Sequence, residues 1–144
     1  MRAPTLRVYP RETVIAEELE AMVSLDIANS RTKDFYDIVV LSREFDFDGI
    51  SLVKAITATF ARRGTALPSG APLALTGEFA ENAAKKVQWE AFVRNAGIID
   101  ADNFVSTVNT VSSFLSEPLA AAGADTTFES HWPKGGPWMR DGNA

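Results

Sequence analysis

The apolar residues of this chain recur mostly every three or four positions, which is the period of a helix with one buried face. The longest such stripe, from Phe104 to Leu119, predicts a helix that Pro118 ends or kinks. The connecting segments are short or contain proline and glycine, as is usual between packed helices. The same spacing predicts four further helices, over residues 11–25, 33–44, 49–63 and 83–95.

Residues with known preferences for helix ends support these boundaries. Thr32, Asp48 and Asp102 stand where a side-chain oxygen caps the first free N–H groups of a helix. Gly64 and Gly97 follow the last apolar positions of their segments, where a left-handed residue ends a helix. The sequence therefore predicts an all-α (mainly α) fold, a bundle-like domain of about five helices.

Two segments outside these helices have a different pattern. Residues 6–9 alternate apolar and polar positions before Pro10, which predicts one short strand. No later segment reads as its partner, so the strand either pairs with a second copy of the chain or belongs to a sheet outside this sequence. Residues 128–144 are rich in Trp, Pro and Gly and are expected to form an irregular tail. This divides the chain into a strand remnant (1–9), a helical domain (10–127) and the tail.

The composition describes a folded protein and excludes several kinds of chemistry. Hydrophobic residues make up 46% of the 144 residues and charged residues 23%, which is typical of a globular domain. The net charge of −5 argues against a nucleic-acid surface over the whole domain, since such surfaces need clustered Lys and Arg. The absence of cysteine excludes disulfides, thiolate metal sites and thiol catalysis. No apolar run reaches the roughly 18 residues of a membrane span, and we see no signal peptide, so we expect a cytoplasmic location.

Carboxylates interrupt the apolar faces of the first two helices. The helical period places Glu18 between Met22 and Leu25 on the first helix. Asp34 falls on the apolar side of the second helix, with Asp37 one turn away. Buried carboxylates need a partner or a bound cation, so the pattern predicts that Glu18 and Asp34 face one another across the helix pair and border a cleft.

A structural explanation of the same carboxylates is also open. Asp34 lies in the first turn of its helix, where free N–H groups and the helix dipole favour a negative charge. Glu18 could pair with Arg11 or Arg31 in an ion pair that only holds the helices together.

The segment YPRETVIAEELEAMVSLDIANSRTKDFYD, residues 9–37, resembles a block of the AbiEii/AbiGii family of nucleotidyltransferase-like toxins from abortive-infection toxin–antitoxin systems. The family pattern is a strand ending in Tyr-Pro, then E-T-x-x-A-E-K, and then R-x-K-D-x-Y-D. The tail around residues 131–138 is also similar to that of bacterial members. The resemblance implies a two-part protein. Its N-terminal α/β part has a Gly-Ser loop and a D-x-D/E pair that holds metal, and its helical C-terminal part completes the nucleotide cleft.

This chain resembles the helical part, which in the family contributes an Asp from K-D-x-x-D and a Lys from A-E-K. The resemblance carries the catalytic role to Asp34, and Arg31 and Lys33 beside it are candidate nucleotide-binding cations. Glu18 stands where the family has the Lys, and a carboxylate repels phosphate, so the roles of Glu18 and Asp37 are left open. NTP and Mg²⁺ are implied for the intact family protein, and we expect no cofactor or metal in this chain alone.

The motifs of the family's N-terminal α/β part are absent from the sequence. Ser69-Gly70 reverses the Gly-Ser order and lies in a loop. Asp46 and Asp48 spell D-x-D, but Asp48 is already explained as a helix cap. We therefore expect the C-terminal helical portion of an AbiEii-type nucleotidyltransferase, which contributes to the NTP and substrate cleft and is inactive alone. The alternative is a small helical protein–protein interaction module, the remnant of a split or decayed toxin.

Partners follow from the same interpretation. The expected partners are a second copy of the chain or a separate nucleotidyltransferase half, and an antitoxin. RNA or protein would be a substrate only of the intact protein, and no membrane is involved.

The remaining candidate residues have simpler explanations. Glu12 and Glu17 match the family pattern and are expected to be structural. His131 alone cannot make a metal site, so packing or exposed polarity explains it better. Trp132 and Trp138 lack the basic neighbours of base-stacking residues and are expected to anchor the tail onto the helices.

Overall fold

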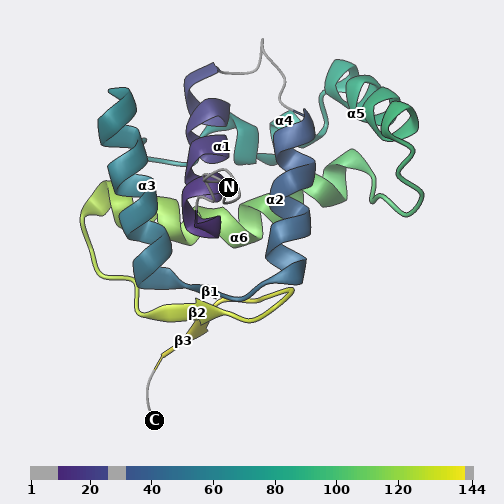
Figure 1. Cartoon of the computed structure of the whole chain (residues 1–144). Helices are drawn as coiled ribbons and strands as arrows, with labels where there is room; N and C mark the ends of the chain where they lie inside the picture. The colour runs from purple at the N-terminus through teal and green to yellow at the C-terminus, as the bar shows by residue number, and fades with distance from the viewer. Residues whose placement is uncertain (1–9, 26–31, 142–144) are drawn as a thin grey trace, which may run out of the picture.

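The computed structural model describes residues 10–25 and 32–141, and this part of the chain is mainly α-helical, as predicted. Figure 1 shows α3, α1 and α2 standing side by side, with α6 crossing behind them and a small sheet at one end. The short α4 is additional to the five predicted helices. The helices are α1 (Arg11–Leu25), α2 (Thr32–Glu44), α3 (Gly49–Arg63), α4 (Gly77–Ala80), α5 (Ala83–Ala96) and α6 (Phe104–Ala124), with a 3-10 turn at Leu73–Leu75.

The core lies where α6 meets the three upright helices. The predicted stripe of α6 is buried, with Val111 and Leu115 fully inaccessible to solvent. Ile15 and Leu19 of α1 are equally buried. Burial of such side chains contributes roughly 1.5–3 kcal/mol each, which is why the helical period in the sequence is a reliable guide to this part of the fold. None of the described helices is long and apolar enough to cross a membrane.

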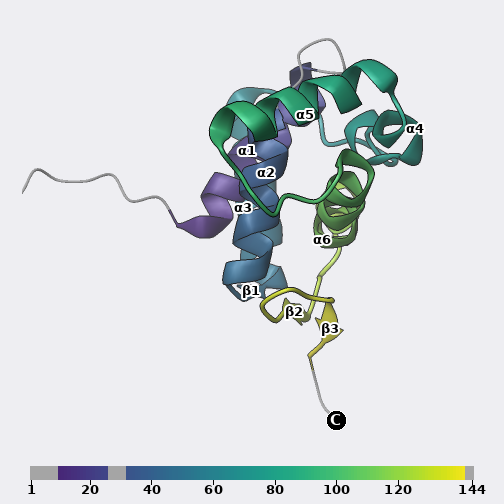
Figure 2. The same ribbon diagram turned by 90° about the vertical axis from the view of Figure 1, so that its right-hand side faces the viewer.

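Helix α5 is packed differently from the others, because only Lys85 and Trp89 among its residues are buried. Figure 2 shows α5 lying across the end of the molecule opposite the sheet. The helix is well defined at both ends: Asn82 accepts a hydrogen bond from the Lys85 N–H at 2.9 Å, and Gly97 ends it with φ 70°. Its sequence therefore specifies a helix firmly, and Trp89 is the one aromatic side chain of that helix that is buried, while Phe92 packs beside it against Tyr36 of α2.

Three of the predicted helix ends, Asp48, Gly64 and Gly97, are confirmed, and the predicted cap Asp102 is wrong. Asp48 caps α3 by accepting a hydrogen bond from the Ser51 N–H at 3.0 Å, and Gly64 ends α3 in the left-handed region. The cap of α6 is Asn103 rather than Asp102, since the Asp102 carboxylate is held 2.6 Å from Arg43 of α2.

Pro118 does not end α6, which continues to Ala124. A proline inside a helix removes one N–H and leaves the carbonyl four residues earlier without its helical partner. Here that carbonyl belongs to Phe114, and it accepts a hydrogen bond from the Trp138 indole at 2.7 Å. A side chain from the tail thus replaces the hydrogen bond that the proline removes.

The prediction of an irregular tail is wrong, because the tail supplies two strands of a small antiparallel sheet. The strand order is β1-β2-β3, and Phe47 lies opposite Trp132. Strands this short show no alternation that a sequence pattern could detect. The predicted strand at residues 6–9 lies outside the described residues. The observed strands are β1 (Phe47–Asp48), β2 (Ser130–Trp132) and β3 (Met139–Arg140).

Both tail tryptophans anchor the tail on the helices, as expected. The Trp132 indole donates to the Ser42 carbonyl at 2.8 Å, and the Gly135 N–H donates to the same carbonyl at 2.8 Å. The Trp132 ring packs on Phe114 with centroids 4.7 Å apart. Together with the Trp138 hydrogen bond, these contacts attach the sheet to α2 and α6.

We expect Gly49→Ala to destabilise the protein by about 1–3 kcal/mol. A Cβ atom at residue 49 would lie 2.7 Å from the backbone oxygens of Phe128, just before β2, and of Ser130, the first residue of β2. Urea denaturation measures the loss, and Gly77→Ala is the matched control because a Cβ there meets nothing within 4 Å. Equal stability of the two variants would show that the chain before β2 can move aside.

Candidate functional site

The candidate site is a cluster of three carboxylates, which we call the α1–α2 cluster. Glu18 of α1 and Asp34 and Asp37 of α2 each place an oxygen within 4.8 Å of the others. Asp34 is buried, with 3% of its surface exposed, and the other two are half-buried. The prediction that Glu18 and Asp34 face one another is confirmed, while the cleft that they were predicted to border stays a prediction.

The cluster changes the ionisation of Glu18. Burial, a hydrogen bond to Asp37 and the charges of Asp37 and Asp34 together raise the pKa of Glu18 to about 9. Removal from water disfavours the charged form of any carboxyl group, and nearby negative charges add to that effect. Glu18 is therefore protonated at neutral pH. Its Oε1 atom is buried and has no hydrogen-bond partner within the described part of the chain.

Lys33 lies at the edge of the cluster. Its Nζ atom is 2.7 Å from Asp37 Oδ2, one helical turn away, and 72% of its side chain is exposed. The hydrogen bond to Asp37 raises the pKa of Lys33 above its usual value. A phosphate that binds Lys33 must compete with Asp37 for it. Arg31, the other predicted cation, lies outside the described residues.

The structural partners proposed for these carboxylates are only partly found. Arg11 does not pair with Glu18, because its guanidinium stacks 4.2 Å from the ring centre of Phe45. Glu17 does have a structural contact, since it forms ion pairs with Arg62 and with Arg63 of α3, the latter at 2.7 Å. Burial opposes the effect, but these two arginines lower the pKa of Glu17. Glu17 therefore ties α1 to α3, as a structural residue would.

The α1–α2 cluster fits a cation better than a bare phosphate. Carboxylate oxygens are the ligands that Mg²⁺ prefers, and Glu18, Asp34 and Asp37 can each supply one. A triphosphate without a cation would meet three acidic side chains and a lysine that is already paired. The pKa of Glu18 is raised mainly by burial and further by the charges of Asp37 and Asp34, and a bound cation would offset those charges.

Other predicted candidates fall away from this site. Asp48 of the D-x-D sequence is used as the cap of α3, as expected. His131 is exposed on β2, with Nδ1 2.8 Å from an Asp141 carboxylate oxygen.

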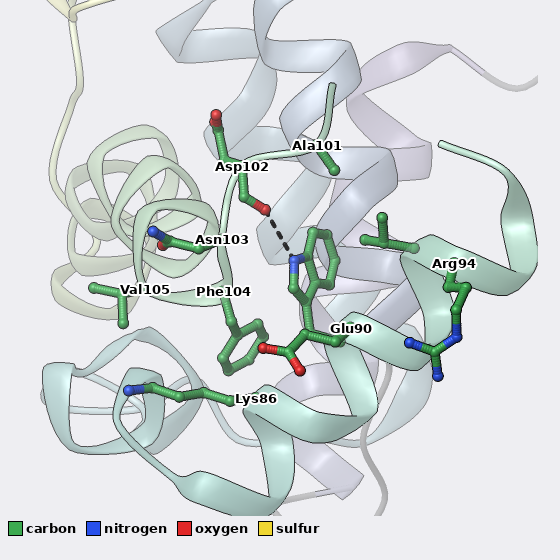
Figure 3. A pocket seen from close by; sticks show the side chains of 10 residues that line it. Lys86, Glu90, Arg94, Ala101, Asp102, Asn103, Phe104 and Val105 are labelled. Atoms are coloured by element: carbon green, nitrogen blue, oxygen red, sulfur yellow. Dashed lines mark hydrogen bonds between the residues drawn. The ribbon is translucent and has the colours of Figure 1, made fainter. Parts of the chain in front are cut away.

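A hollow between α5 and the start of α6, which we call the α5–α6 cavity, was not predicted. It has a volume of about 440 Å³. Lys86, Glu90 and Arg94 follow one another along α5 and line the hollow together with the segment 101–105 (Figure 3). The available signal was the spacing of Lys86, Glu90 and Arg94, which follow one another at intervals of four residues and so lie on one face of the helix.

Comparison with known proteins identifies the class. Residues 1–112 match the family described as "Nucleotidyl transferase AbiEii toxin, Type IV TA system". A match over this share of the 144 residues makes the chain a nucleotidyltransferase-like protein of toxin–antitoxin type. The chain belongs to the AbiEii family. No curated protein and no solved structure matches it.

Proposed function

We propose that this chain forms the helical wall of the NTP and substrate cleft of an AbiEii-type nucleotidyltransferase. One observation carries the proposal. Asp34, at the position that the family pattern marks as catalytic, is buried and shares a cluster with Glu18 and Asp37. Buried carboxylates held close together are unfavourable for folding alone, so such a cluster is typical of a site for a cation or a reacting group.

The side chains would divide the work as follows. Asp34, with Asp37, would hold the cation of an incoming Mg–NTP, and the cation would supply neutralisation of the triphosphate charge. Lys33 and Arg31 would bind phosphate oxygens, Lys33 by leaving Asp37. Glu18 would release its proton when the cation arrives, because positive charge lowers the pKa of a carboxyl group.

The sequence has no Gly-Ser loop with a following D-x-D pair, so we propose that these motifs come from a segment outside the 144 residues. The chain would then be catalytically inactive by itself and would transfer nucleotides only when joined or mixed with that segment. The family also places the chain in a toxin–antitoxin system, so an antitoxin is a proposed partner and the cytoplasm its proposed location.

We expect the purified chain with Mg²⁺ and each labelled NTP to transfer no nucleotide to RNA or protein, because the metal-holding pair is absent. Adding a nucleotidyltransferase half from another member of the family should produce transfer. Asp34→Ala should abolish it, and Asp46→Ala, at an exposed carboxylate, should not. Transfer by the chain alone that Asp34→Ala removes would contradict the proposed division of the site.

A small interaction module is the second candidate, and one observation favours it. Val87 of α5 and Ile99 after it are 64% and 90% exposed, which is unusual for large apolar side chains. A module of this kind would bind a protein partner through these residues and would stay inactive with any added half. Loss of partner binding in Ile99→Lys, with no transfer under any condition, would favour this function over the first.

A further inference from the structure

The α5–α6 cavity is a separate feature from the α1–α2 cluster, and its lining has a chemistry of its own. Its volume of about 440 Å³ is in the range of small-molecule sites, roughly 300–1,000 Å³. It lies between α5, of which only Lys85 and Trp89 are buried, and the segment 101–105 that leads into α6. Trp89 and Phe104 give it an aromatic wall, with ring centres 5.9 Å apart, and Val93 and Val105 add aliphatic surface.

The wall is held in place before any ligand arrives. The Trp89 indole donates to the Asp102 carbonyl at 2.9 Å, as the dashed line in Figure 3 shows. The Asp102 carboxylate in turn pairs with Arg43 of α2 at 2.6 Å. A preformed wall binds more tightly, because little ordering remains to be done when the ligand enters.

The charged side chains around the cavity fall into two kinds. Lys86 and Asp102 already have partners, since Lys86 pairs with Glu81 at 2.7 Å and Asp102 with Arg43. Glu90 and Arg94 are four residues apart on α5, a spacing that favours an ion pair. Yet neither makes an ion pair with any residue that the structure describes. The cavity therefore offers one carboxylate and one guanidinium to a ligand.

We propose that the α5–α6 cavity binds a small zwitterion with an aromatic or large aliphatic body, such as an apolar amino acid or a dipeptide. The body would lie against Trp89 and Phe104, the ammonium group would pair with Glu90, and the carboxylate would pair with Arg94. A triphosphate does not suit the site, because it would meet Glu90. A ligand without charges does not suit it either, because covering Glu90 and Arg94 without partners is unfavourable. The proposal does not depend on the function proposed for the α1–α2 cluster.

The test uses L-phenylalanine as the probe and the indole N–H resonances of the full chain as the readout. The chain has three tryptophans, so three such signals are expected, and Trp89→Phe assigns one of them. Phenylalanine at millimolar concentrations should shift the Trp89 signal to saturation and leave those of Trp132 and Trp138 in place. Phenylalaninamide, which lacks the carboxylate, and N-acetylphenylalanine, which lacks the ammonium group, should each bind about tenfold more weakly.

Two variants assign the charges to residues. Glu90→Gln should remove the difference between phenylalanine and its N-acetyl form, and Arg94→Gln the difference between phenylalanine and its amide. Glu117→Gln, at an exposed carboxylate of α6 outside the cavity, should leave all three affinities unchanged. No shift of the Trp89 signal with any probe would overturn the site. Equal binding of all three probes would overturn the zwitterionic ligand and leave only an apolar hollow.

Discussion

Trp132→Ala is expected to destabilise the protein by about 3–5 kcal/mol, the usual loss when a buried tryptophan is truncated. The Trp132 side chain is buried and contacts the rings of Phe114 and Trp138, at centroid distances of 4.7 Å and 5.4 Å. The substitution leaves a cavity beside α6 and removes the hydrogen bond to Ser42. For a protein of this size the midpoint of thermal unfolding should fall by on the order of 10 °C.

The matched variant Trp132→Phe separates packing from hydrogen bonding. It retains most of the ring contact and loses only the indole N–H, so the loss should be about 1–2 kcal/mol. Calorimetry or urea denaturation of both variants at one pH measures the difference. If Trp132→Ala unfolds with the midpoint of the unmodified protein, the sheet is not part of the cooperative core.

Stability is expected to decrease as the pH rises from about 5 to 9, and Glu18→Gln should remove most of that decrease. The pKa of Glu18 is about 9 in the folded protein and has its usual value of 4.5 in the unfolded chain. Between these values only the unfolded chain releases the proton, so the contribution of Glu18 to stability is greatest below pH 4.5 and is lost as the pH approaches 9. The free energy of unfolding should change by at most about 1.4 kcal/mol per pH unit, and by less here because Glu18 is only half-buried.

Other shifted groups act outside this window. The lowered pKa of Glu17 affects stability below pH 4.5, where its ion pairs are lost as the pH falls. The raised pKa of Lys33 affects it above pH 10.5. Urea denaturation at several pH values tests the assignment, with Glu12→Gln as a control on the same helix. A slope that Glu18→Gln leaves unchanged would show that Glu18 does not retain its proton in the folded state.

The sequence predicts the fold correctly where one face of a helix packs against the rest of the domain. The stripes of α1 and α6 specify their helices, and Asp48, Gly64 and Gly97 specify helix ends, because these are local effects. The sheet was not predictable, because it joins residues 47–48 to a tail that begins at residue 130. The continuation of α6 through Pro118 depends on an equally distant partner.

The candidate site was predictable in its members and not in its electrostatics. Helical spacing placed Glu18 and Asp34 on facing sides, which the geometry confirms. In the sequence, Glu18 stands where the family pattern has a lysine, which suggested a permanent negative charge at this position. Only the three-dimensional arrangement shows that burial, together with the neighbouring carboxylates, raises the pKa of Glu18 to about 9. The catalytic role of Asp34 stays a prediction.

The hydrogen bonds of the two tail indoles also set the order of events on the ribosome. Helix α6 emerges with a Phe114 carbonyl that Pro118 has left without a backbone partner, and its indole partner, Trp138, comes 24 residues later. The Ser42 carbonyl is synthesised still earlier relative to its donor, because Trp132 follows it by 90 residues. Synthesis from the N-terminus thus delivers Trp132 and Trp138 after all the helices that the structure describes. The nascent chain can complete this part of its fold only after translation has passed residue 138. Until then the Phe114 and Ser42 carbonyls lack their indole donors, and the region around them is accessible to chaperones and proteases.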